Sequence, residues 1–229
     1  LVRACEALYD VCVAYGIPLI SGKDSMKNDY KIGATKISIP PTVLFTAASV
    51  IEDVRRVVSM DVKRPGDLVY VLGVTKDEMG GSEFLAMRGQ LGGVPPTVDT
   101  EKCLDLYRKL SAAMKQELVA SCHDCSDGGL GATIAETAFA GGYGIVADLS
   151  ALGVPNAAVT LFSESQGRFV ATVRAKDQEA FEKTLAGSAC RRVGNVTEEL
   201  SLRLTLPGGL RCDAPLAELK EAWQKTLRW

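Results

Sequence analysis

The sequence predicts a layered α/β or α+β fold in which helices cover a mixed sheet. Short apolar runs of strand length alternate with segments whose apolar residues recur at helical spacing. The 229 residues are 47% hydrophobic and 24% charged, which is typical of a globular protein and argues against a disordered chain or a coiled coil. Their number allows one large domain or one and a half average ones.

The first quarter of the chain contains signals for two helices and two strands. Its less polar residues recur first at helical spacing, up to Gly16, which is a typical helix stop. Because the chain begins inside this first helix at Leu1, we expect a piece of a longer polypeptide. The expected elements are a helix over residues 1–15, strands over 17–20 and 43–50, and a short helix over 52–59.

A second domain follows Pro65 and Gly66, two breakers in a stretch without apolar side chains. We therefore expect one domain at 1–64, a second at 65–208 and a terminal helical segment at 209–229. The strands expected in these parts lie over 68–74, 118–122, 145–149, 168–173, 192–196 and 202–206. The helices expected there lie over 100–117, 130–140, 177–185 and 216–229.

Charge and residue counts exclude several classes of function. The 26 Lys and Arg against 28 Asp and Glu, with no basic tract, argue against nucleic acid as a partner, because phosphate neutralisation needs clustered cations. No window is apolar enough for a membrane span and no signal peptide opens the chain, so we expect a cytoplasmic protein without a membrane partner. One His cannot build a site of several imidazoles, and seven Cys fit free thiols in a reducing compartment.

The strongest local signal is the segment Ser-Cys-His-Asp-Cys-Ser-Asp-Gly-Gly-Leu at residues 121–130. A predicted apolar strand is followed here by Asp124, Ser126, Asp127 and two glycines, which lie at the start of a predicted helix. Backbone N–H groups at a helix N-terminus attract phosphate, glycines let a ligand approach, and carboxylates are ligands that Mg²⁺ prefers. This pattern predicts a phosphate and Mg²⁺ site, and the alternative is a turn in which Ser126 or Asp127 only caps the helix.

Cys122 and Cys125 form a CxxC pair around His123. Structural zinc usually needs four ligands, and no second cysteine pair has suitable spacing, so we favour buried thiols over a zinc or redox site. Neighbouring side chains on a strand point to opposite faces, which disfavours a catalytic Cys–His pair. We therefore expect neither glutaminase nor cysteine protease chemistry within this chain.

Three other polar segments are weaker signals. Residues 21–25, Ser-Gly-Lys-Asp-Ser, offer groups suited to phosphate, but Ile17 stands where a Walker A loop has a glycine, and a solvated turn is the alternative. Residues 80–83, Gly-Gly-Ser-Glu, and 162–168, Phe-Ser-Glu-Ser-Gln-Gly-Arg, could orient a polar ligand or form capped loops. Taken singly, neither supports a functional claim.

Together, in this order, the four segments resemble the C-terminal half of the phosphoribosylformylglycinamidine synthase family, the formylglycinamide ribonucleotide amidotransferases. The resemblance covers almost the whole chain. It implies a superfamily shared with aminoimidazole ribonucleotide synthetase, selenophosphate synthetase, thiamine-monophosphate kinase and a hydrogenase-maturation protein, all of which use ATP. It also implies that 1–64 ends an N-terminal ATP-binding domain and that 65–208 is an aminoimidazole ribonucleotide synthetase-like C-terminal domain.

The reaction that the resemblance implies is ATP-dependent amidation of formylglycinamide ribonucleotide with ammonia from glutamine. It places Gly22 at ATP and Ser25 at the substrate, gives Mg²⁺ to Asp124, and brings Ser126 to a nucleotide, either ATP or a structural ADP. Lys23 stands where some smaller relatives have an Asn ligand, and an ammonium group cannot coordinate a cation, so the resemblance gives no metal to that loop.

The family's His-rich catalytic loop and its glutaminase triad have no counterpart in this sequence. We therefore expect no catalytic residue here, a missing N-terminal half of the same polypeptide, and ammonia from a glutaminase domain or subunit. An exposed pseudo-dimer face would allow a homodimer of the fragment. Two alternatives stay open, namely a non-catalytic half that holds ADP as a scaffold, and a small-molecule kinase of the same superfamily.

Overall fold

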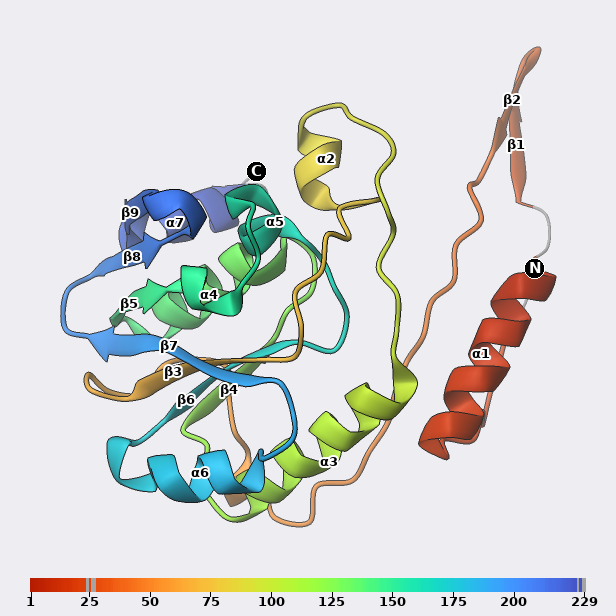
Figure 1. The fold of residues 1–229 in the computed structure, drawn as a ribbon. Helices are drawn as coiled ribbons and strands as arrows, with labels where there is room; N and C mark the ends of the chain where they lie inside the picture. Colours follow the sequence, from red (N-terminus) through yellow and green to blue (C-terminus); the bar gives the residue numbers. More distant parts are fainter. Residues whose placement is uncertain (24, 26–27, 226, 228–229) are drawn as a thin grey trace. The chain divides into compact units, whose positions relative to one another are not determined.

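The computed structural model describes residues 1–23, 25, 28–225 and 227, and the chain divides into two compact units, Leu1–Val54 and Arg55–Trp229 (Figure 1). Residues 55–64, which precede the predicted second domain, belong to the second unit and already pack on it. The N–H of Val62 donates to the carbonyl of Thr137 at 3.2 Å, and the carbonyl of Ser59 accepts from the N–H of Cys122 at 3.1 Å.

The first unit contains one long helix and one hairpin among its described residues. Helix α1 (Val2–Tyr15) ends at Gly16, whose φ of 66° lets its N–H reach the last carbonyls of the helix, as predicted. The hairpin of β1 (Asp29–Ile32) and β2 (Thr35–Ser38) was not predicted. The predicted strands over 17–20 and 43–50 are wrong, because these residues pair with no strand among the described ones.

The second unit is built on a mixed sheet, which confirms the predicted fold class. In the described residues this sheet has seven strands in the order β4-β6-β3-β7-β5-β8-β9, and only the β5–β8 pair is parallel. The strands are β3 (Leu68–Leu72), β4 (Ser121–Asp124), β5 (Gly144–Asp148), β6 (Phe169–Val173), β7 (Cys190–Thr197), β8 (Ser201–Thr205) and β9 (Arg211–Pro215).

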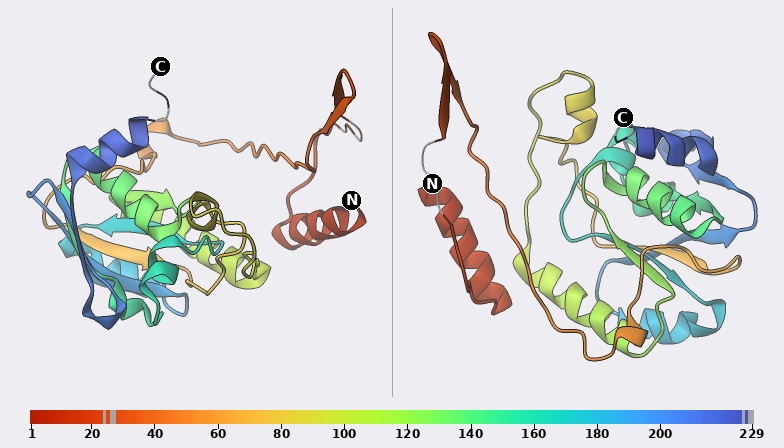
Figure 2. Two further views of the ribbon diagram at one scale, coloured as in Figure 1. Left: turned by 90° about the horizontal axis from the view of Figure 1, so that it is seen from above. Right: turned by 180° about the vertical axis from the view of Figure 1, so that it is seen from behind.

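Helices cover both faces of this sheet (Figures 1 and 2). Along β3, Leu68, Tyr70 and Leu72 pack into a cluster with α3 and α6, whereas Val69 and Val71 pack into a second cluster with α4. This double burial explains why the apolar run of β3 has no polar alternation. The helices are α2 (Glu83–Met87), α3 (Thr100–Lys115), α4 (Gly129–Gly141), α5 (Ala157–Phe162), α6 (Gln178–Thr184) and α7 (Leu216–Lys225).

Three further parts of the chain differ from the sequence prediction. Residues 52–59 contain only the 3₁₀ turn Val54–Arg56 and not a helix. The segment 209–229 is not only a helix, because β9 precedes α7 and adds to the sheet edge beside β8. Helix α5 was missed although Asn156 caps it, accepting from the N–H of Ala158 at 2.8 Å.

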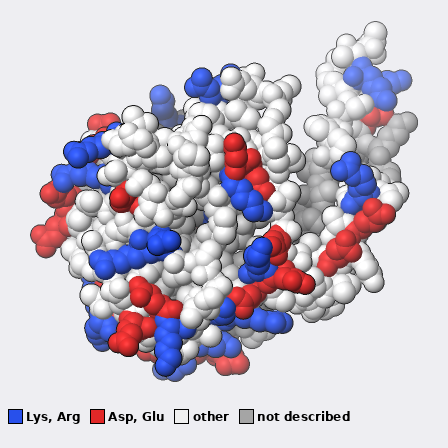
Figure 3. All heavy atoms as spheres, viewed as in Figure 1, with Lys and Arg blue, Asp and Glu red and all other residues white. Residues whose placement is uncertain are grey.

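Among the described residues, no helix is both long and apolar enough to cross a bilayer. On the face shown in Figure 3, cationic and anionic side chains are interspersed, in keeping with the balanced charge of the sequence.

Candidate functional site

Three of the four polar segments lie in loops at the same end of the sheet. In the β-ladders Leu72 pairs with Phe169, and Phe169 pairs with Asp124. The carboxyl ends of β3 and β4 therefore lie beside the amino end of β6. The loops that follow or precede these ends carry residues 80–83, 124–129 and 162–168, so the strand order brings together segments that are far apart in the sequence.

Glu164 joins these loops through one carboxylate oxygen. Its Oε1 accepts from the N–H of Glu83 at 2.9 Å, at the start of α2, and from the N–H of Gly128 at 2.9 Å, just before α4. Charge-assisted bonds of this kind are the stronger class of protein hydrogen bonds. The Glu164 carboxylate thus ties the start of α2 and the loop before α4 to the loop that contains Glu164.

Arg168 is buried and organises the same loops. Its side chain is only 1% exposed, and it donates to the carbonyls of Ser165 and Ser163 and to the hydroxyl of Thr75, at 2.8, 2.5 and 2.9 Å. Burial lowers the pKa of this guanidinium below its usual value. Arg168 therefore links the loop after β3 to the loop before β6.

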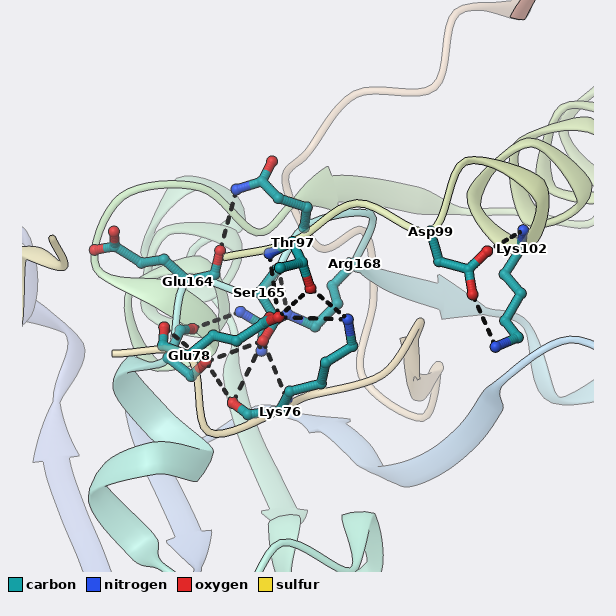
Figure 4. Close-up of polar contacts among 10 residues, drawn as sticks. Lys76, Glu78, Thr97, Asp99, Lys102, Glu164, Ser165 and Arg168 are labelled. Atoms are coloured by element: carbon teal, nitrogen blue, oxygen red, sulfur yellow. Dashed lines mark hydrogen bonds and ion pairs between the residues drawn. The ribbon is translucent and has the colours of Figure 1, made fainter. Parts of the chain in front are cut away.

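Glu78 is a second buried charge that sequence reasoning missed. Its Oε1 accepts from the N–H and the hydroxyl of Thr97, at 3.1 and 2.6 Å, and lies 3.4 Å from Nζ of Lys76 (Figure 4). Burial raises the pKa of Glu78, but hydrogen bonds from Thr97 and Ser165 outweigh burial, and the pKa lies below its usual value. The ionised Glu78 thus fastens the loop before α3 to the loop after β3.

Asp124 and Ser126, the two site residues predicted in the second unit, lie in contact. The hydroxyl of Ser126 donates to Oδ2 of Asp124 at 2.6 Å, and Nδ1 of His123 lies 3.4 Å from Oδ1. The Ser126 hydrogen bond keeps the pKa of Asp124 below its usual value, although burial acts against it. The Asp124 side chain is 64% exposed, so this ionised carboxylate faces solvent and is accessible to a cation.

The donor set around Asp124 fits a magnesium ion shared with a phosphate ligand. Among the described residues no group of three His, Cys, Asp or Glu side chains is placed to hold a metal. Mg²⁺ commonly takes only one or two carboxylates, with phosphate oxygens and water as its other ligands. Asp124 can therefore supply one ligand, but the described residues provide no complete set of metal ligands there.

The two glycines at the start of α4, Gly128 and Gly129, serve the packing of the chain itself. Gly128 has a φ of 80°, and its N–H is already bonded to Glu164. A Cβ on Gly129 would lie 2.5 Å from the carbonyl oxygen of Ser163, and the N–H of Gly129 donates to the carbonyl of Ser126 at 3.0 Å. The case for a phosphate site thus rests on Asp124 and Ser126 and not on the glycines.

The CxxC cysteines lie on opposite sides of the sheet, in keeping with buried thiols. Cys122 packs against the cluster with α3, Cys125 belongs to the cluster with α4, and both are free thiols. Burial raises the pKa of Cys122 to about 12 and also raises that of Cys125. His123 turns away from Cys122 toward Glu136 on α4, which confirms the predicted opposition of neighbouring side chains.

Gly22 and Ser25 belong to the first unit and are exposed. Nζ of Lys23 donates to the hydroxyl of Ser25, while Asp24 and Met26 of the same segment lie outside the described residues. Gly22 and Ser25 thus lie in no helix or strand of the described residues.

Glu136 is a further polar residue at this end of the sheet that sequence reasoning missed. It lies 2.8 Å from Nε2 of His123. The signal that could have found it is composition, because Glu136 is the only charged residue in the otherwise small and apolar helix α4. A lone carboxylate on a helix that packs against a sheet needs a polar partner.

Comparison with known proteins identifies the family. Residues 64–207 match the model of the AIR synthase related protein, C-terminal domain. The chain belongs to this family. Over 228 residues it is 36% identical to the phosphoribosylformylglycinamidine synthase subunit PurL of Parafrankia sp. (strain EAN1pec), covering 98% of this chain and 29% of that protein. The chain thus spans less than a third of the length of this relative.

Solved structures of PurL from T. maritima share the fold of this AIR synthase-related chain. The structure complexed with FGAR has a TM-score of 0.69 at 17% identity, over 92% of this chain and 36% of that one. The structure complexed with ADP has a TM-score of 0.56 at 19% identity, over 72% of this chain and 27% of that one. At these identities the likeness establishes the architecture alone.

Proposed function

We propose that this chain is the C-terminal part of a phosphoribosylformylglycinamidine synthase and binds a magnesium nucleotide at Asp124 and Ser126. The observation that carries the proposal is the exposed, ionised Asp124 beside the Ser126 hydroxyl, at the end of the sheet where three loops meet. The similarity to PurL over nearly the whole chain and the ADP complex of a relative with the same fold support it.

In this proposal Asp124 supplies one carboxylate oxygen to the metal and Ser126 keeps that carboxylate ionised and oriented. When bound, the Mg²⁺ ion neutralises phosphate charge. Glu164, Arg168 and Glu78 keep the surrounding loops in place, and none of them is given a chemical step. Gly22 would contact ATP and Ser25 the formylglycinamide ribonucleotide.

The parent reaction is ATP-dependent amidation of formylglycinamide ribonucleotide with ammonia released by a glutaminase domain or subunit. Catalytic groups are assigned to the part of the enzyme that this chain lacks. The chain alone should therefore not convert the ribonucleotide with ATP and ammonium, and measurable turnover would contradict that assignment.

Calorimetric titration with Mg–ADP tests the site directly. Asp124→Asn should weaken Mg–ADP binding at least about 10-fold, because one anionic ligand is lost. Asp213→Asn is the matched control, since Asp213 is an exposed carboxylate on the edge strand β9. Equal binding by the unmodified chain and Asp124→Asn, or no binding by the unmodified chain, would overturn the proposal.

A further inference from the structure

Helix α2 lies on the loop before β6 through two contacts that are adjacent in the sequence. The N–H of Glu83 donates to Oε1 of Glu164 at 2.9 Å. The next residue, Phe84, stacks on Phe162 with ring centroids 4.8 Å apart and an interplanar angle of 12°. Helix α2 has only five residues and none of them is buried, so specific contacts of this kind hold it in place.

The turn that carries the proposed metal ligand, residues 124–129, lies on the same loop. The N–H of Cys125 donates to the carbonyl of Arg168 at 2.9 Å, and the N–H of Gly128 donates to Oε1 of Glu164 at 2.9 Å. These bonds continue the pairing of β4 with β6 beyond the end of the ladder. The position of the turn therefore depends on the backbone of one loop residue and on the side chain of another.

One oxygen of Glu164 thus serves helix α2 and the turn together. The Glu164 side chain points away from Glu78 and Arg168 (Figure 4), so the N–H groups of Glu83 and Gly128 orient its carboxylate. If α2 moves away, the carboxylate loses one of these two donors and can turn more freely. Its bond to Gly128 is then weakened, and with it the attachment of the turn.

We propose that Glu164 is a positioning residue that couples helix α2 to the nucleotide site. With α2 docked, Glu164 keeps the turn that bears Asp124 and Ser126 in the conformation that binds Mg–ADP. This inference rests on the proposed magnesium nucleotide site. The coupling must be reciprocal, so Mg–ADP favours the docking of α2 by the same factor by which docking favours Mg–ADP. Couplings of this kind typically change affinity about 5- to 150-fold.

Hydrogen exchange of the full 229-residue chain, followed by mass spectrometry on peptides that contain Glu83 or Gly128, measures the docking of α2 and of the turn. Mg–ADP should slow exchange in both peptides. Phe84→Ala removes the ring stack and leaves Glu164 and the turn unaltered. Even without nucleotide, this variant should speed exchange about 10-fold at Glu83, whose hydrogen bond to a charged group is lost, and a few-fold at Gly128.

Calorimetric titration with Mg–ADP measures the reciprocal effect. Glu164→Ala should weaken binding at least about 5-fold. Glu164→Gln retains a carbonyl oxygen as acceptor and should recover most of the affinity. Phe84→Ala should weaken binding a few-fold. Met87→Ala, at a position 79% exposed on the same helix, is the matched control and should change neither affinity nor exchange.

The outcomes separate this inference from the proposed function. If Asp124→Asn loses Mg–ADP while Glu164→Ala and Phe84→Ala bind as tightly as the unmodified chain, the coupling is overturned and the nucleotide site stands. Binding that Glu164→Gln restores no better than Glu164→Ala, with an equal fall in melting temperature, would make Glu164 a structural residue and also overturn it. Exchange at Gly128 that ignores Phe84→Ala contradicts the coupling without any nucleotide. If the unmodified chain binds no Mg–ADP, the proposed function fails and this inference fails with it.

Discussion

Two apolar runs of this chain, one in each unit, differ in structure: one forms a buried strand and the other forms no strand. Strand β3, Leu-Val-Tyr-Val-Leu, is 4% exposed or less at every residue, because β6 and β7 flank it and helices cover both faces. Residues 43–50, Val-Leu-Phe-Thr-Ala-Ala-Ser-Val, form no strand, and Leu44 is 89% exposed. In this chain an apolar run therefore becomes a strand only where neighbouring strands supply hydrogen-bond partners and helices cover its side chains.

The largest expected contrast comes from truncating one leucine in each run. Leu72→Ala should lower the free energy of unfolding of the second unit by about 4 kcal/mol, since Leu72 is fully buried and its removal leaves a cavity. Leu44→Ala should change it by no more than about 0.5 kcal/mol. Urea unfolding followed by circular dichroism measures both values. A large loss in Leu44→Ala would show that residues 43–50 are buried in solution.

Arg168→Met should have the next largest effect. The substitution retains part of the side-chain volume but leaves the buried carbonyls of Ser163 and Ser165 without their donor. Unsatisfied buried groups cost about 1–3 kcal/mol each, so we expect a loss of about 3 kcal/mol in the same urea experiment. Arg211→Met, at an exposed position of the edge strand β9, is the matched control. Equal stability of the two variants would contradict the organising role of Arg168.

Glu78 should make the second unit sensitive to acid. Folding lowers its pKa below the ordinary value of 4.5, so its contribution to stability is complete above that value and is lost as pH falls through the lower folded pKa. Glu78→Gln should cost about 1.5 kcal/mol at pH 7, as hydrogen bonds to a charged group are replaced by weaker ones. Its stability should then vary less between pH 5 and pH 3. A variant with an unchanged acid profile would exclude Glu78 as the responsible group.

The smallest expected effect belongs to the first unit. Gly16→Ala places a Cβ on a residue whose φ is 66°, which costs about 1 kcal/mol at the end of α1. Because this strain is local, helical circular dichroism of a peptide of residues 1–23 should fall, while urea unfolding of the second unit should stay unchanged. Gly22→Ala, where φ is not in the left-handed region, is the control. A fall in the stability of the second unit would show that the two units are energetically coupled and would contradict this prediction.

Much of the fold could be predicted from local sequence signals. Helix α1 with its Gly16 stop, helices α3 and α4, and the runs that form β3, β5 and β6 depend on periodicity and caps within one segment. The hairpin of the first unit, α5 and β9 could not be predicted in this way. Strand β9, Arg-Cys-Asp-Ala-Pro, has no large apolar side chain and becomes a strand because β8 offers an edge to pair with.

The sequence by itself determined the contact of Asp124 with Ser126, since both lie in one turn, and the free thiols, since no cysteine pattern favours metal or disulfide. Only the tertiary structure decided that Glu164 bonds to two loops, that Glu78 fastens Thr97, and that α7 reaches His123 through Glu136. The physical reason is the order of the strands. Hydrogen bonds between distant segments form where β4, β6 and β3 end side by side, and that neighbourhood is set by the whole sheet.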